Sequence, residues 1–356
     1  MRFVRLENCT EGMVVGKTIF GINGMMLLRY GTVVRQSHID TLLRMGYAGM
    51  YIDDAISAGI DIPEVVDRAT QAKAQQALEN LFAESKLSKI TNTARMVKDV
   101  EGVLGDIIKQ IITNRDMVAN ITSLKTFDGY TFQHCVDVCV LSLILGREFQ
   151  MNRKDLENLG KTAIFHDIAK MFVSQNLLNK PSRLTPEEYE EIKKHSQLGY
   201  DCLKNLLNQP EIICEGVLYH HERYEGGGYP SGREGNEIPI YARIIALTDV
   251  YDAITSKRAY KDAMIATEAY EYIMGNIGKH FDPLVVNAFL RKIPPFPVGS
   301  GIILSDGRKA IVAENKPSFM TRPIVRIVNE GANEAGDFVD LANDADARSV
   351  TIVGSF

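Results

Sequence analysis

Cysteine is scarce in this sequence and shows no pairing pattern. The chain has five cysteines, an odd number, and none of them forms a CxxC pair. Long spacings of this kind predict free thiols in a reducing compartment rather than a disulfide framework. A cytoplasmic location is therefore expected. The five residues are Cys9, Cys135, Cys139, Cys202 and Cys214.

Long apolar runs and an excess of basic charge are missing as well. The most apolar stretch, residues 138–145, is far shorter than the ~20 residues of a membrane-spanning helix. Residues 1–7 lack the apolar core and cleavage site of a signal peptide. The formal net charge is -5, which argues against duplex nucleic acid as a partner but leaves room for a small phosphorylated ligand in a local basic pocket. The sequence predicts a soluble protein without a membrane span.

The residue patterns divide the 356 residues into four segments of a mainly α protein. Residues 1–62 predict a small N-terminal α+β domain of unknown input, and residues 63–124 a helical connector. Residues 125–292 show one helical apolar pattern after another, which predicts a helical bundle. A proline-rich run at 294–297 marks the last boundary, and residues 293–356 predict a small C-terminal β module.

Apolar spacing predicts the elements inside these segments. In the first segment, residues 13–19 and 25–29 are expected to form a hairpin. A short helix is expected over residues 37–43 and a strand over residues 50–52. Helices are expected over 64–87, 93–121, 129–149, 155–172 and 240–256. A further helix is expected to begin at Thr185, where Pro186 and Glu188 are helix-start signals. Another helix is expected to lead into His220. The β module is expected to have strands at 301–304, 309–313 and 324–328 and a polar loop over 329–348.

Adjacent histidines followed by a glycine-rich loop are the most informative stretch. His220 and His221 end an apolar run, and the loop that follows closes on Gly228, Tyr229 and Pro230. Neutral imidazoles are good transition-metal ligands, and glycines let a backbone approach a ligand closely. The pattern indicates a metal site beside a substrate lid. A histidine pair in a surface turn is the alternative interpretation.

Five of the seven histidines fall in the predicted bundle, each near the end or inner face of a predicted helix. Two carboxylates accompany them, Asp167 and Asp249. Bundles build metal sites from side chains on facing helices. These ligands are too many for one four-coordinate ion and suit two ions, roughly 3.5–4 Å apart, that share a carboxylate. Imidazole and carboxylate without thiolate indicate two divalent ions of iron or manganese, with zinc as a further option. The histidines are His134, His166, His195, His220 and His221.

Lys170 follows His166 by four residues and Asp167 by three, so on a helix it shares their face. An ammonium group beside two metal ions could neutralise a phosphate or a leaving group. A solvated lysine at a helix end is the alternative. Glu222, next to the histidine pair, is either a residue that orients an imidazole or an exposed side chain.

These motifs together resemble the HD superfamily of metal-dependent phosphohydrolases, and in particular its HD-GYP branch of bacterial cyclic di-GMP phosphodiesterases. The resemblance covers about residues 125–292. It rests on these sequences: residues 166–170 (HDIAK), residues 178–188 (LNKPSRLTPEE), His195 with Gly199, residues 220–222 (HHE), residues 228–230 (GYP), and residues 249–253 (DVYDA) with Arg258 and Lys261.

The resemblance implies an HD-type helical bundle and assigns site residues by position. Asp167 would bridge the two ions, and the catalytic residues would be Asp167 and Lys170. Tyr130 stands where some members carry a glutamate that binds a third metal, which favours a dinuclear site. Ala169 replaces a usual glycine and Glu225 a usual aspartate. The implied metal ligands are His134, His166, Asp167, His195, His220, His221 and Asp249. The implied substrate-binding residues are Lys170, Gly228, Tyr229, Pro230, Arg258 and Lys261.

The implied activity is hydrolysis of cyclic di-GMP to linear pGpG, to GMP, or to both, by a hydroxide held between the two ions. One alternative is a non-catalytic signalling module that binds a cyclic dinucleotide, or another protein, through the Gly-Tyr-Pro loop. Another is the same chemistry on a different cyclic dinucleotide. Other signalling proteins and a second copy of the chain, in a homodimer, are further candidate partners.

Overall fold

The computed structural model describes residues 1–21, 25–86, 93–114, 130–178, 180, 182–256, 264–317, 319–329 and 335–356. The chain forms two compact units. One contains Val66–Arg115 and Gly129–Phe289 and is helical; the other contains both chain ends, Met1–Val65 and Leu290–Phe356, and carries the strands. The prediction of a mainly α protein with small β parts is confirmed.

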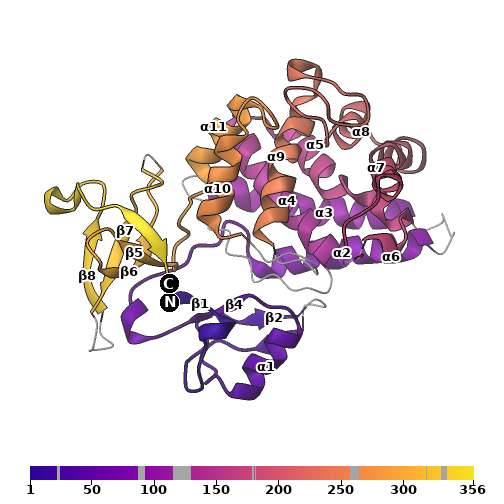
Figure 1. Cartoon of the computed structure of the whole chain (residues 1–356). Coiled ribbons are helices and arrows are strands. Elements are labelled where there is room, and N and C mark those ends of the chain that lie inside the picture. The colour runs from indigo at the N-terminus through magenta and orange to yellow at the C-terminus, as the bar shows by residue number, and fades with distance from the viewer. Residues whose placement is uncertain are drawn as a thin grey trace. The chain divides into compact units, whose positions relative to one another are not determined.

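The helical unit is built around α4, which packs against α5 and α9, while α7 and α8 pack together beside α5 (Figure 1). Helices α2 and α3 pair with each other and cover α4 and α5. Among the described residues, no helix is long and apolar enough to cross a membrane. The helices are α2 (Arg68–Lys86), α3 (Thr93–Thr113), α4 (Tyr130–Glu148), α5 (Arg153–Phe165), α6 (Gln175–Leu178), α7 (Pro186–Asp201), α8 (Glu211–Leu218), α9 (Ile240–Thr255), α10 (Ala266–Gly275) and α11 (Pro283–Lys292), whose last residues belong to the other unit.

Local sequence signals explain how α7 begins and how it packs. Thr185 accepts a hydrogen bond from the Glu188 backbone and the Glu188 side chain accepts one from the Thr185 backbone, with Pro186 as the first helical residue. This capping box is the one expected from sequence. Gly199 lets α8 approach α7, since a Cβ there would lie 2.9 Å from Val217. The helix that carries His195 and the helix that leads into His220 are therefore held in close contact.

Among the residues that the structure describes, the other unit holds three antiparallel sheets. Strands β1 (Arg2–Arg5) and β4 (Gly49–Ile52) pair, and β2 (Ile19–Phe20) pairs with β3 (Met26–Leu28), beside α1 (Gln36–Arg44). The third sheet has the order β8-β7-β6-β5-β9. Its strands are β5 (Gly301–Leu304), β6 (Lys309–Glu314), β7 (Ile324–Val328), β8 (Ala335–Asp340) and β9 (Ile352–Ser355).

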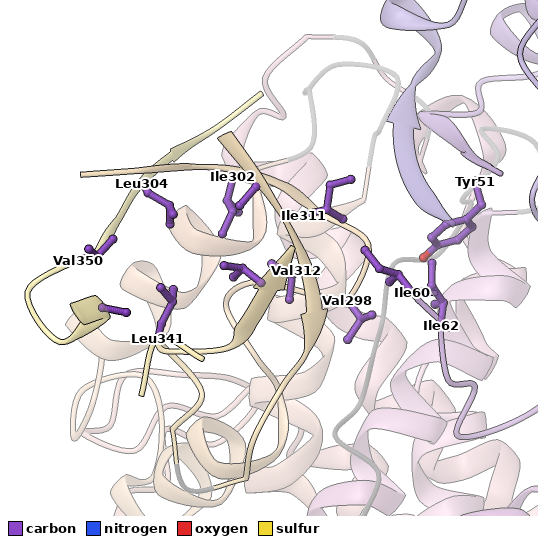
Figure 2. Close-up of a cluster of buried hydrophobic side chains, with 13 residues drawn as sticks. Tyr51, Ile60, Ile62, Val298, Ile302, Leu304, Ile311, Val312, Leu341 and Val350 are labelled. Carbon is purple, nitrogen blue, oxygen red and sulfur yellow. The ribbon is translucent and has the colours of Figure 1, made fainter. Parts of the chain in front are cut away.

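Residues from both chain ends share one hydrophobic cluster in this unit (Figure 2). Tyr51, Ile60 and Ile62 from the N-terminal segment pack with residues of the five-stranded sheet, and the Phe3 backbone donates to the Gly299 carbonyl at 2.9 Å. The sheet and its connections contribute Val298, Ile302, Leu304, Ala310, Ile311, Val312, Val325, Leu341, Ala347 and Val350. The four-segment division with boundaries at residues 62, 124 and 292 stays a prediction.

Two sequence expectations are wrong. The polar stretch 329–348 is not simply a loop, because β8 lies within it and pairs with β7. The helix expected over 155–172 ends at Phe165, and a 3-10 helix, η4 (Ile168–Phe172), follows. Residues 22–24 of the hairpin turn expected over 21–24 lie outside the described residues, as does the end of the helix expected over 93–121.

Candidate metal centre

The histidines predicted as ligands converge from separate elements of the helical unit. His134 lies on α4, His195 lies on α7, and His166 follows the last residue of α5. His220 and His221 follow α8. The side chains of His134, His166, His195 and His220 are buried, and that of His221 is partly buried. The helix ends therefore bring five imidazoles into one interior region.

A local hydrogen bond fixes the tautomer of three of these rings. In His166, His195 and His220, Nδ1 lies 2.8, 2.7 and 2.6 Å from the carbonyl oxygen three residues earlier. A carbonyl oxygen can only accept, so Nδ1 carries the proton and Nε2 keeps its lone pair. The three Nε2 atoms are thereby available as metal ligands.

Burial also keeps the inner rings neutral. It lowers the pKa of His195 to about 4, with a further contribution from the Lys170 ammonium. It lowers the pKa of His220 to about 3 and holds the pKa of His221 well below its usual range. Neutral imidazole is the form that binds metal, so these rings need not release a proton before they bind a metal ion at neutral pH.

His134 is held by two carboxylates on α9. Its Nδ1 lies 2.6 Å from Asp252 Oδ2, and its Nε2 lies 3.0 Å from Asp249 Oδ1. Burial opposes the charged ring, but the hydrogen bonds to Asp249 and Asp252 outweigh it and raise the pKa of His134 to about 9. Asp252 was not among the predicted site residues. Its position three residues after Asp249 on one helix was the available signal.

Asp167 lies at the centre of the ligand atoms. It belongs both to a group with His195, His220 and His221 and to a group with His134 and His166, and within each group the ligand atoms lie within 4.8 Å of one another. His166 Nε2 and Asp167 Oδ1 are buried without a hydrogen-bond partner in the described structure. Buried polar atoms without partners are costly, and a cation between them would satisfy both. The donor set therefore fits divalent metal ions.

Lys170 reaches Asp167 from η4. Its Nζ lies 2.6 Å from Asp167 Oδ2, and its side chain is partly exposed. Although burial opposes it, the Lys170 ammonium holds the pKa of Asp167 well below its usual range. The carboxylate is thus ionised, with the Lys170 ammonium beside it.

The glycine-rich loop brings Tyr229 over the cluster. The Tyr229 ring centroid lies 4.7 Å from that of His221 at an interplanar angle of 30°, and 6.4 Å from that of His195. Gly228 lies against Glu222, and a Cβ at Gly228 would come within 2.4 Å of the Glu222 Cα. Only glycine fits this approach. Pro230 follows in the same loop, so the Gly-Tyr-Pro signature lies at the imidazole cluster.

Some predicted residues differ from expectation or are not described. Glu222 is buried and contacts backbone amides of the loop instead of orienting an imidazole. Arg258 and Lys261 lie outside the described residues. Tyr130 is the first residue of α4, and its side chain is also outside the described part.

Comparisons with known proteins agree with this geometry. The family model for the HD domain matches residues 106–285. The chain is 32% identical over 256 residues to the cyclic di-GMP phosphodiesterase PA4108 of Pseudomonas aeruginosa, a match that covers 72% of this chain and 61% of that protein. It is 33% identical over 187 residues to the 3'3'-cGAMP-specific phosphodiesterase 1 of Vibrio cholerae, covering 51% of this chain and 43% of that protein. In both cases the matched part of the chain spans less than two thirds of the relative's length.

A solved structure shares the fold. Bd1817, an HDG"Y"P protein from Bdellovibrio bacteriovorus, superposes with a TM-score of 0.50 at 17% sequence identity. The match covers 80% of this chain and 97% of Bd1817. At this identity the likeness concerns the fold, and it extends well beyond the residues of the metal centre.

Proposed function

Since the chain belongs to the HD domain family and to its HD-GYP branch, we propose that it is a metal-dependent phosphodiesterase that hydrolyses cyclic di-GMP. The observation that carries the proposal is the pair of ligand groups that share Asp167. A shared carboxylate is typical of two-metal hydrolytic sites. The products would be linear pGpG, GMP, or both.

The proposed ligands are the seven residues expected from sequence, with Asp167 as the bridge. Imidazole and carboxylate donors favour two divalent ions of iron or manganese, with zinc as a further option. When bound, such ions supply Lewis acidity and lower the pKa of a coordinated water towards ~7. The hydrogen bonds to Nδ1 orient the imidazoles before any ion arrives, which reduces the cost of assembling the site.

Other residues would act on the substrate. The Lys170 ammonium, next to the bridging carboxylate, balances negative charge on the phosphoryl oxygens as it builds up. Tyr229, with Gly228 and Pro230, forms one wall of the site and limits access of water. Arg258 and Lys261 are proposed to bind the phosphate that does not react, as their positions in the family motif imply. A cytoplasmic location, a homodimer and contacts of the Gly-Tyr-Pro loop with signalling proteins also stay predictions.

The direct test is metal analysis and product analysis on the same preparation. Protein purified without oxygen should contain two equivalents of iron or manganese per chain and convert cyclic di-GMP to pGpG or GMP. Removal of the metal with a chelator should stop the reaction, and adding the metal back should restore it. Tight binding of cyclic di-GMP without turnover by fully metal-loaded protein would instead support a non-catalytic module.

A different cyclic dinucleotide is the second candidate substrate. The similarity to a 3'3'-cGAMP-specific relative favours testing it, because that protein matches about half of this chain. Equal amounts of cyclic di-GMP and 3'3'-cGAMP should be offered together, and the ratio of kcat/KM values read from the competition. We expect cyclic di-GMP to be preferred; a preference for 3'3'-cGAMP would change the substrate and leave the chemistry intact.

Substitution of Asp252 by asparagine should weaken metal binding by about 10-fold to 100-fold, the usual effect of losing the partner that orients a ligand histidine. The change leaves the shape of the side chain intact but removes the charge that contacts His134 Nδ1. Metal affinity should be measured by competition with a chelator of known strength.

The matched control is Asp282→Asn, which removes an equally buried carboxylate that pairs with Arg243 at 2.6 Å. That variant should lower the unfolding temperature without changing metal affinity. Equal metal affinity in Asp252→Asn and the parent protein would show that Asp252 only fills space.

A further inference from the structure

Glu222 is a buried carboxylate with no place in the reaction proposed above. Its side chain is only 1% exposed, although it follows directly after His221. One oxygen, Oε1, accepts hydrogen bonds from the backbone amides of Ser231 at 2.8 Å and Gly232 at 3.0 Å. The other oxygen, Oε2, has no hydrogen-bond partner in the described structure. A single side chain thus ties the two ends of the segment 222–232 together.

Tyr229 lies inside the loop that this side chain closes. The Tyr229 backbone amide donates to the His221 carbonyl at 3.3 Å, and Gly228 lies against the Glu222 backbone. The outer part of the loop is held separately, by amides of Tyr224 and Glu225 that donate to the backbone of residues 280 and 279. The Tyr229 ring also lies near Tyr189 and Lys193, but the side-chain hydrogen bonds of Glu222 are those that close the inner part of the loop in the described structure.

We propose that Glu222 is a positioning residue: its side chain folds the segment 223–232 around itself and thereby holds Tyr229 against His221. The proposal rests on the proposed function in one respect, since Tyr229 is taken as a wall of the substrate site. What matters is the reach of the side chain, because Oε1 alone makes both hydrogen bonds. Glutamine keeps that reach and the acceptor oxygen, whereas aspartate keeps the charge and is one methylene too short.

The chain has no tryptophan, so Tyr229→Trp places a single fluorescent reporter in the loop. In the metal-loaded reporter protein, the introduced indole should be shielded from acrylamide quenching. Adding Glu222→Gln should leave the shielding intact, whereas Glu222→Asp or Glu222→Ala should remove it and shift the emission to the red. The metal content of each protein is measured alongside and should stay at the parent value.

Kinetics without the reporter give the second readout. Glu222→Asp should raise KM for cyclic di-GMP by roughly tenfold or more, because it loses both hydrogen bonds of Oε1 and one such bond is worth up to about that factor, whereas Glu222→Gln should change KM by less than about threefold. The effect should be lost in the Tyr229→Ala background, because a residue that acts only through Tyr229 shows no further effect when Tyr229 is gone.

The opposite ranking would overturn the proposal. If aspartate keeps shielding and KM while glutamine loses them, the charge of Glu222 acts on the metal centre. A reporter indole that is already exposed with Glu222 intact, or equal losses in both Tyr229 backgrounds, would also refute it. Fluorescence does not depend on turnover, so a protein that hydrolyses no cyclic dinucleotide would refute the proposed function while the quenching result still decides the role of Glu222.

Discussion

Replacement of Asp167 by asparagine should abolish hydrolysis and lower the metal content of the protein. Its two oxygens face different rings, with Oδ1 at 3.5 Å from His195 Nε2 and Oδ2 at 3.4 Å from His166 Nε2. Asparagine offers one oxygen and no charge, so it cannot bridge two cations. Because changes around a metal ligand already cost 10-fold to 100-fold, loss of the bridge should reduce metal affinity by more than about 100-fold. Elemental analysis and initial rates measure both effects.

Asp201→Asn is the control for this variant. Asp201 is the last residue of α7, accepts a hydrogen bond from Gln197 at 3.2 Å and belongs to neither group of ligand atoms. Its loss should change neither metal content nor rate. If Asp167→Asn retained full metal content and near-parent turnover, the bridging role would be wrong, and with it the two-metal interpretation.

The gathering of the five histidines in one interior region was predictable because its signals are local. Each histidine stands at the end or inner face of a helix whose apolar pattern is clear, and the residue types alone indicate metal ligation. The carbonyl oxygens that fix His166, His195 and His220 lie only three residues upstream, so the helix that delivers each ring also orients it. The early end of α5 was not predictable, since the apolar pattern runs on through the 3-10 helix that follows.

Contacts between residues far apart in the chain could not be predicted from the sequence. His134 and Asp252 are 118 residues apart; the spacing from Asp249 places Asp252 on the same helix face, but no local pattern pairs it with His134. The core shared by Tyr51 and Val298 joins segments that read as separate modules, because each has its own apolar pattern. The strand β8 was missed for a related reason: its polar residues fit a strand only when β7 is beside it.

Replacement of Lys170 by methionine should separate metal binding from catalysis. The Lys170 ammonium contacts Asp167 Oδ2 at 2.6 Å and would compete with a metal ion for the carboxylate proposed as the bridge. Methionine keeps the apolar length of the side chain and removes the charge. Metal content should therefore stay equal or rise, the reverse of the result expected for Asp167→Asn.

Turnover should fall even though the metal stays. In the proposed reaction the ammonium offsets charge that grows on the phosphoryl oxygens in the transition state, and loss of one such group costs about 100-fold to 1000-fold in kcat. Lys161→Met is the matched control, because Lys161 on α5 is similarly exposed, at 23% against 25%, and pairs with Glu101 of α3 at 2.6 Å. A fall in kcat with KM little changed, seen in Lys170→Met and absent from Lys161→Met, would place the charge in the transition state. Parent-like kcat in Lys170→Met would mean that the lysine only balances Asp167 in the metal-free protein.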